Sequence, residues 1–346
     1  MKILVPVEDP LFGAAIVDLI ARHNWPPRSQ FIVVHVIEPN LLNSPAHTVF
    51  FKQLEVNEEQ VVRDAATLVN SVAQAINISH PDAIVSQEVV QAHVKAQIIR
   101  MAEKWDADLI IAGTHGRSGF SRFVLGSVSL SLTSELKAPL ILVRYDAQPL
   151  ETWETLDYLS MVQQAFEHNK KKQPSERSIR KVLVALDETA LSNQVIAFIT
   201  KHNWDPECEF KLLSVVEKPA AFLLSESAAK QLSDRLADET EKRLQEFSST
   251  LIAEMKNSRI ETTVTKGQAK KVILSTAKDW NADLLIVGCH FQNSISRFLL
   301  GSVSLPTLCE APCSVLLIKE SQLAKPAIDE KELIVHRSES VVPVTK

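Results

Sequence analysis

Short apolar runs alternate with longer stretches whose apolar residues recur every three or four positions. The apolar runs of the first half lie at residues 3–7, 31–37, 83–90, 108–112 and 140–143. Runs of this length without polar alternation are typical of strands buried on both faces of a parallel sheet. Helical spacing predicts helices at residues 12–23, 61–76 and 94–105, and another starting near Ser127. The pattern predicts an α/β fold: a doubly wound parallel sheet with helices on both faces.

The second half of the chain repeats the first. Residues 105–109, WDADL, return as WNADL at 280–284, and residues 121–130 match 296–305 at nine of ten positions. Strands of the second copy are predicted near residues 181–186, 210–216, 260–265, 283–287 and 315–318. A repeat of this length indicates two copies of one folding unit. We therefore predict two domains, at residues 1–145 and 180–320, a linker at 146–179 and a polar tail at 321–346.

Composition narrows the range of functions. The chain has 346 residues, 45% of them hydrophobic, and a net charge of −5, which argues against a dedicated nucleic-acid binder. Only a short apolar run precedes Glu8, and no apolar run is long enough for a membrane helix, so we expect a cytoplasmic protein without membrane contact. The four cysteines form no C-x-x-C pair, so we expect buried thiols and no metal site: Cys208, Cys289, Cys309 and Cys313.

Glycines gather between the predicted fourth strand and the following helix. Four of the eight in the chain lie within fourteen residues: Gly113, Gly116, Gly119 and Gly126. Glycine permits positive φ and a close approach of main chain to ligand, and the start of a helix adds unpaired N–H groups. With the hydroxyls of Ser127 and Ser129, the segment is suited to phosphates at the carboxyl ends of the strands. The alternative is that these glycines only shape a loop.

The spacing Gly113-Thr114-His115-Gly116, nine residues, then Gly126-Ser127 resembles the G-x2-G-x9-G-[S/T] motif of the universal stress protein family. The first strand and the end of the second, His35-Val36-Ile37, are similar to that family too. The resemblance covers both copies, about 290 residues, which suggests a tandem member. It implies two five-stranded sheets, each with strand order 3-2-1-4-5.

The resemblance also implies ATP binding, and the phosphates of a bound nucleotide can themselves recruit Mg²⁺. Carried over by position, the phosphate and ribose side would be Gly113, His115, Gly116, Gly126, Ser127, Val128 and Ser129. The adenine side would be Pro6, Val7, Glu8 and Val36. Glu8 stands where the family usually has aspartate, which makes the adenine side the weaker match.

The second copy departs further from the motif. Its loop reads Gly288-Cys289-His290-Phe291, so that Phe291 replaces the second glycine, while Asp187 keeps the usual acid. A phenyl side chain competes for the space that phosphates need. We therefore expect one competent ATP site, in the first copy, and a structural role for the second.

No catalytic motif is present, so we expect no enzyme, or at most slow ATP hydrolysis. The family commonly dimerises along the fifth strand. Here residues 140–143 and 315–318 would pair within one chain, forming a pseudo-dimer, and a further homodimer is left open. The alternative function is a scaffold that binds no nucleotide, or a binder of a small apolar ligand.

Overall fold

The computed structural model of the chain describes residues 1–39, 58–114, 125–144, 178–217, 226–255, 258–289, 301 and 303–320. Most of the predicted linker and all of the predicted tail lie outside these residues. So do His115 and Gly116 of the predicted site, and Phe291 of the second copy.

The first half alternates strands with helices as the sequence predicted. Every predicted strand is present to within two residues at each end. The elements are β1 (Lys2–Pro6), α1 (Pro10–Arg22), β2 (Gln30–Ile37), α4 (Glu58–Ser79), β3 (Ile84–Gln91), α5 (Val94–Trp105), β4 (Leu109–Gly113), α6 (Ser127–Glu135) and β5 (Leu140–Val143). The strands are parallel, in the order β3-β2-β1-β4-β5.

The second half repeats this arrangement. Its elements are β6 (Lys181–Ala185), α9 (Ala190–Lys201), β7 (Glu209–Val216), α10 (Glu226–Glu254), β8 (Arg259–Lys266), α11 (Ala269–Asp279), β9 (Leu284–Cys289), α12 (Ser304–Glu310) and β10 (Ser314–Lys319). Its strand order, β10-β9-β6-β7-β8, is that of the first half read from the other end.

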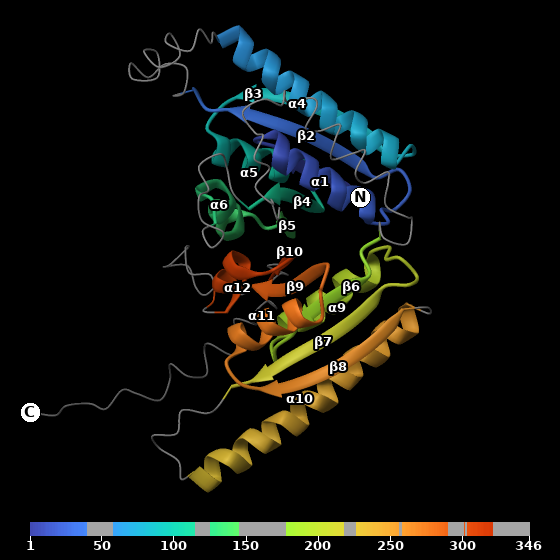
Figure 1. The fold of residues 1–346 in the computed structure, drawn as a ribbon, viewed down its shortest axis with the longest axis vertical. Coiled ribbons are helices and arrows are strands. Elements are labelled where there is room, and N and C mark those ends of the chain that lie inside the picture. Colours follow the sequence, from blue (N-terminus) through green and yellow to red (C-terminus); the bar gives the residue numbers. More distant parts are fainter. Residues whose placement is uncertain are drawn as a thin grey trace, which may run out of the picture.

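The two halves share one ten-stranded sheet, because β5 pairs with β10 (Figure 1). This pair is antiparallel, with Leu142 opposite Val315 and Leu140 opposite Leu317. All four residues of β5 are buried, so the pairing covers an apolar edge strand. The two fifth strands therefore meet within one chain, at the residues that the sequence analysis named.

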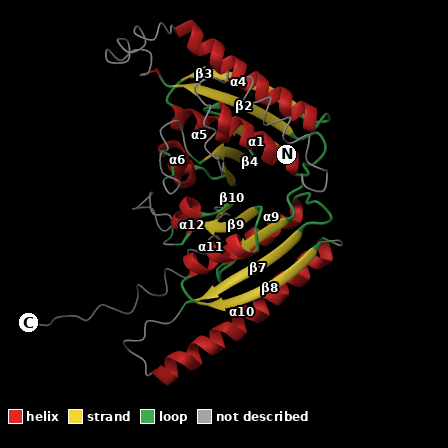
Figure 2. Cartoon of the chain, viewed as in Figure 1, coloured by secondary structure: helices red, strands yellow, loops and turns green. Residues whose placement is uncertain are grey.

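Helices cover both faces of each half-sheet (Figure 2). In the first half, α1 and α4 pack on one face, and α5 and α6 on the other. Successive strand residues supply opposite layers: Ile3 and Val5 belong to the core under α1 and α4, and Leu4 to the core under α5 and α6. Within the part of the chain that the structure describes, no helix is both long and apolar enough to cross a bilayer.

Two basic side chains cross between the halves at matching positions. Lys319, which is buried at the end of β10, donates from Nζ to Leu132 O at 2.8 Å and Leu136 O at 2.6 Å, in the last turn of α6. Arg144 follows β5 and donates from Nη2 to two carbonyl oxygens in the last turn of α12, those of Leu308 and Cys309. Each half thus caps a helix of the other.

The cysteines are less uniformly buried than predicted. Cys208 and Cys289 are buried, but Cys309 and Cys313 are half-buried. The last two lie at the end of α12 and in the turn before β10, where the chain passes along the surface. The expectation of four buried thiols is therefore wrong for these two.

Candidate functional site

The carboxyl ends of three neighbouring strands form one edge of the first half-sheet. β1 lies between β2 and β4, with Ile3 beside both Phe31 and Leu109. Pro6 ends β1 and Gly113 ends β4, while Val36 is the penultimate residue of β2. The structure therefore brings the predicted adenine side and the start of the glycine segment to one edge, where doubly wound sheets bind ligands.

The two ends of the glycine segment are tied together beside β5. Thr114, which is buried, donates from its backbone N to Val143 O at 3.2 Å. Its carbonyl accepts from the backbone N of Gly126 at 2.9 Å. This bond holds Thr114, at the end of β4, next to Gly126, at the start of α6. His115 and Gly116 lie in that segment, outside the described residues.

Helix α6 begins at this junction without a side-chain cap. Gly126 occupies the N-cap position and has no side chain to offer. Ser127 is exposed and Val128 is half-buried. The first N–H groups of a helix have no partner within it, and they lie at the positive end of the helix dipole. An anion at the carboxyl end of β4 would therefore meet backbone donors at the start of α6.

Ser129 has a structural task in both halves. Its side chain is buried, and Oγ donates to Gly113 O at 2.7 Å, which fastens α6 to the end of β4. The matching Ser304 donates to Gly288 O at 3.1 Å. The hydroxyl proton of Ser129 is thus engaged with the protein, and what the residue can offer a ligand is its backbone at the helix start.

The glycines at the junction do not have positive φ. Gly126 has φ −59° and ψ 151°, and no described glycine lies in the left-handed region. The expectation that these glycines provide positive φ is therefore wrong for Gly113 and Gly126. Gly113 is needed for packing instead, since a Cβ there would lie 2.6 Å from the ring of Phe12. Gly288 is constrained in the same way by Leu191, at 2.7 Å.

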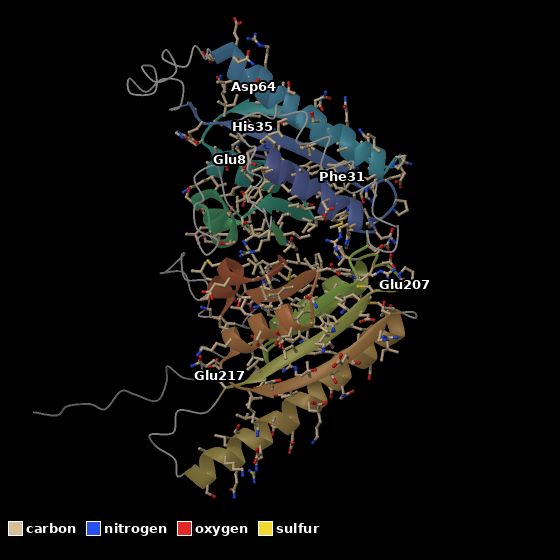
Figure 3. All side chains as sticks on the ribbon, in the orientation of Figure 1. Glu8, Phe31, His35, Asp64, Glu207 and Glu217 are labelled. Atoms are coloured by element: carbon tan, nitrogen blue, oxygen red, sulfur yellow. The ribbon has the colours of Figure 1, made fainter. Side chains whose placement is uncertain are left out.

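Two acids follow β1, and they have different tasks. Glu8 is exposed at the edge of the sheet (Figure 3). Asp9 is buried, and its Oδ1 accepts from the backbone N of Leu11 at 2.9 Å and of Phe12 at 3.1 Å, which caps α1. The capping by Asp9 was not predicted, although aspartate before a proline is a typical helix start.

A histidine of β2 contacts the backbone of the residue that follows β1. His35 Nδ1 lies 2.8 Å from the carbonyl oxygen of Val7, and the backbone N of Val7 donates to Val34 O at 2.9 Å. These bonds fix the chain where β1 ends and hold Val7 against β2. The second half has Ser214 at the position of His35, so this contact belongs to the first half.

The corresponding junction of the second half is built differently. Helix α12 begins at Ser304, the counterpart of Ser129, and so starts two residues later than α6. The backbone N of Leu305 lies 3.4 Å from Gly301 O, whereas the matching bond from Leu130 N to Gly126 O is 2.8 Å. Pro306 explains the weaker start, because it lacks an N–H and disfavours helical geometry at the residue before it.

Asp187, the acid retained in the second half, is engaged at the start of α9. Its Oδ1 accepts from the backbone N of Thr189 at 3.0 Å and lies 3.1 Å from Ser192 Oγ. Among the described residues no group of three possible metal ligands is found in either half.

Glu38 of the first half also accepts from the backbone at a helix start. Its carboxylate accepts from the backbone N of Val94 at 3.0 Å, and this bond lowers the pKa of the carboxyl group.

Comparison with known proteins gives the family. The family model described as the universal stress protein family matches residues 1–144 and 178–319, which is most of the chain. The chain belongs to the universal stress protein family. It carries two such domains in tandem, and the two matched segments coincide with the two half-sheets.

Individual relatives agree with this assignment. The chain is 32% identical over 143 residues to universal stress protein A homolog 2 of Coxiella burnetii, covering 40% of this chain and 94% of that protein. It is 26% identical over 218 residues to universal stress protein Rv2005c of Mycobacterium tuberculosis, covering 62% of this chain and 63% of the relative. A crystal structure of a universal stress protein from Archaeoglobus fulgidus has the same fold: TM-score 0.55, 18% identity, 92% of this chain and 98% of that one.

Proposed function

We propose that the first domain of this universal stress protein binds ATP, and that the second domain supports it structurally. The observation that carries the proposal is the start of α6: an uncapped helix N-terminus lies at the end of β4, beside the ends of β1 and β2. Residues 113–127 resemble the family's glycine motif, and this resemblance is the reason for proposing ATP as the ligand. The protein would act in the cytoplasm, as part of a response to stress.

The phosphates would lie at the start of α6. The backbone N–H groups of Ser127, Val128 and Ser129 provide donors there, and the helix dipole favours negative charge. The bond between Gly126 N and Thr114 O holds this helix start next to the strand ends before any ligand arrives. His115 and Gly116 would complete the phosphate and ribose side.

The adenine would lie against the ends of β1 and β2. Pro6 and Val7 are buried and Val36 is half-buried, so the edge offers apolar contacts and backbone hydrogen-bonding groups. Glu8 is exposed beside them and can accept from an amino group. The first half has this apolar edge and the uncapped helix together, which is the combination that a nucleotide needs.

Mg²⁺ would enter with the phosphates, since the described residues provide no cluster of three metal ligands of their own. We assign the protein a binding function, with hydrolysis at most slow. In the second domain the later start of α12 removes part of the donor set, which supports a single competent site. Two such chains could also associate further, as a homodimer.

The proposal can be tested by titration calorimetry with ATP and Mg²⁺ on the full chain and on matched variants. Val128→Phe and Gly116→Phe place a large side chain in the proposed phosphate seat, and each should reduce ATP affinity by more than about tenfold, because phosphate contacts are lost. Val303→Phe, at the matching position of the second domain, should leave ATP affinity unchanged. Thermal unfolding with and without ATP checks that each variant is folded.

Two results would contradict the proposal. One is a wild-type chain that carries no nucleotide by native mass spectrometry and shows no thermal shift with ATP. That result favours the alternative function, a scaffold without nucleotide. The other is a loss of ATP binding in Val303→Phe together with full binding in Val128→Phe, which would place the site in the second domain.

A further inference from the structure

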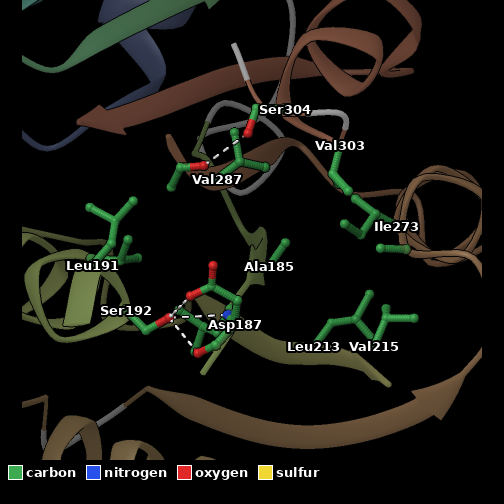
Figure 4. Close-up of a pocket in the computed structure, with 15 residues that line it drawn as sticks. Ala185, Asp187, Leu191, Ser192, Leu213, Val215, Ile273, Val287, Val303 and Ser304 are labelled. Carbon is green, nitrogen blue, oxygen red and sulfur yellow. Dashed lines mark hydrogen bonds between the residues drawn. The ribbon is translucent and has the colours of Figure 1, made fainter. Parts of the chain in front are cut away.

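The second domain contains a hollow of about 240 Å³ at the carboxyl ends of its strands (Figure 4). Its floor comes from the ends of β6, β7 and β9, and its walls come from α9 on one side and α11 on the other. A volume of this size is somewhat below the range of about 300–1,000 Å³ that is usual for ligand pockets. As the described residues line it, the hollow therefore fits a compact molecule.

Most of the side chains that line the hollow are aliphatic. Leu191 and Val195 come from α9, Ile273 from α11, and Leu213 and Val287 from the strands. These residues belong to both core layers of the second domain, so the hollow opens across the tip of the sheet. Burying an apolar ligand against them is favourable by the area removed from water.

The polar side chains of the hollow act as acceptors towards a ligand, and the start of α12 adds the backbone N–H groups of Val303 and Ser304. Asp187 is the one ionisable residue among the described residues of the lining, and none of them is a lysine, arginine or histidine. The hydroxyl of Ser192 donates to Asp187 O at 2.8 Å, and that of Ser304 donates to Gly288 O at 3.1 Å. Both hydroxyl protons are thus engaged with the protein. The side chains of the lining thus offer oxygen atoms and one negative charge, and this charge disfavours an anion.

The first domain differs at the positions that shape the hollow. Phe12 stands where the second domain has Leu191, and its ring lies against Gly113. In the first domain α6 and its backbone donors begin at Ser127. The matching helix of the second domain, α12, begins two positions later, at Ser304. The same fold thus offers anion-binding groups in the first domain, and an aliphatic hollow beside an acid in the second.

We propose that this hollow binds a small neutral ligand, an apolar ring or branched chain that carries one N–H or O–H group directed at the carboxylate of Asp187. The proposal rests on the hollow alone and is independent of ATP binding by the first domain. The second domain then contains a second binding site, which prefers a neutral ligand, whereas the site proposed in the first domain binds an anion.

Benzamide and benzoate provide a matched pair of probes, because they share a ring and differ in charge and in the N–H donor. Saturation-transfer NMR on the full chain at neutral pH should show benzamide bound and benzoate bound roughly tenfold more weakly, since the carboxylate of Asp187 repels it. Val303→Phe fills the hollow from its rim and should abolish the benzamide signal. Val128→Phe, its counterpart in the first domain, should leave that signal unchanged.

Asp187→Asn separates charge from shape, and asparagine preserves the capping geometry at the start of α9. In this variant benzoate should bind several times more tightly, while benzamide changes little. The proposal is overturned if wild-type protein binds benzoate as well as benzamide or binds neither, if Val303→Phe retains benzamide, or if Asp187→Asn still excludes benzoate. ATP titration of the same samples reports on the first domain separately, so either site can fail alone.

Discussion

Single residues at the junction of β4 and α6 pack against one another beside the backbone at which we propose that ATP binds. Gly113 is required by the ring of Phe12, and Ser129 bonds back to Gly113 O. Both contacts have counterparts in the second domain, at Gly288 and Ser304, although the glycine motif is incomplete there. Parts of a nucleotide motif therefore persist for structural reasons, and their presence in one copy is weak evidence for a ligand.

Gly113→Ala should destabilise the first domain by about 1–3 kcal/mol, since its Cβ would overlap the Phe12 ring near its attachment to the backbone. Urea unfolding measures the loss. In a Phe12→Ala background the same change should cost less than half as much, which a double-mutant cycle detects. Gly301→Ala is the control, because the nearest atom to its new Cβ is Ser304 Oγ at 3.8 Å. Additive costs for the Gly113 and Phe12 changes would contradict the packing explanation.

Ser129→Ala should cost about 1 kcal/mol of unfolding free energy, because it leaves the half-buried Gly113 carbonyl without this donor. ATP affinity should fall only slightly, since the backbone N–H at this position remains. Ser127→Ala should have the opposite effects, with a larger fall in ATP affinity than in stability. Because Ser127 is exposed, the unfolding free energy should stay within about 0.5 kcal/mol of wild type. A large loss of ATP affinity in Ser129→Ala, without a loss of stability, would show that its hydroxyl serves the ligand directly.

At the scale of elements, the ends of α6 and α12 depend on the opposite domain. A helix leaves its last carbonyl groups without intrahelical partners. Lys319 donates to two carbonyl groups at the end of α6, of which that of Leu132 also accepts from the backbone N of Leu136, and Arg144 donates to two at the end of α12. Burial lowers the pKa of Lys319 to about 7, from 10.5. The neutral amine still has two N–H groups, which match the two carbonyl oxygens that it reaches.

Lys319→Met should therefore destabilise the protein in a pH-dependent way. The pKa of Lys319 is lower in the folded chain than in the unfolded chain, so wild-type stability falls as pH decreases from 10.5 towards 7. The variant lacks this titration. Its cost relative to wild type should be about 1–3 kcal/mol near pH 10 and smaller near pH 7. Urea unfolding across this range measures the difference.

Arg144→Met provides the matched control, because arginine stays charged throughout this pH range. Its cost should be independent of pH between 7 and 10. Equal and pH-independent costs for the two variants would show that Lys319 remains charged in its buried position, and the explanation based on burial would then fail.

The strands could be predicted from the sequence because their cause is local. Residues such as Leu4 and Val184 are buried whichever face they point to, so each strand is a short apolar run. The late start of α12 was not predicted, although Pro306 gives a local signal for it. The caps by Lys319 and Arg144 could not be predicted at all. Their partners lie more than 160 residues away in sequence, and only the pairing of β5 with β10 brings them together.

The repeat also explains how far the site could be predicted. The strand ends that gather at Pro6, Val36 and Gly113 could be predicted because the resemblance to the family implies the strand order that the structure has. The sequence could not show that a hollow forms beside Asp187. That hollow depends on side-chain volumes at α9 and α11, such as leucine at 191 where the first domain has phenylalanine.

For the whole molecule, the contact between domains extends beyond the paired strands. Arg22 of the first domain forms an ion pair with Asp283 of the second, at 2.5 Å. Nearby, the buried ring of His23 stands edge-on to Trp204 of the second domain, with centroids 5.1 Å apart. Trp25 packs on the other side, at 4.2 Å. The repeated His-Asn-Trp segment thus lies at the domain boundary in the first copy, where it joins the two cores.

This boundary should be sensitive to acid. Burial, together with smaller effects of the nearby His202 and His80, lowers the pKa of His23 to about 3. Because the ordinary value is 6.5, the neutral ring stabilises the folded chain above pH 6.5, and this stability is lost as pH falls towards 3. In wild-type protein the contribution of His23 to the unfolding free energy should fall by up to about 1.4 kcal/mol per pH unit in that range. His23→Gln keeps a neutral polar side chain and should remove this part of the slope.

Urea unfolding between pH 7.5 and pH 4.5 would measure the difference between wild type and His23→Gln, which cancels the contribution of the carboxylates common to both. His202→Gln is the matched comparison. Burial lowers the pKa of His202 too, but this histidine is half-buried, and its Nδ1 lies 2.6 Å from Phe198 O. Its effect should have the same sign and a smaller size. A parallel loss of stability in wild type and His23→Gln would show that the neutral His23 ring does not make the domain boundary acid-sensitive. The ion pair of Arg22 with Asp283 would then be the next contact to test.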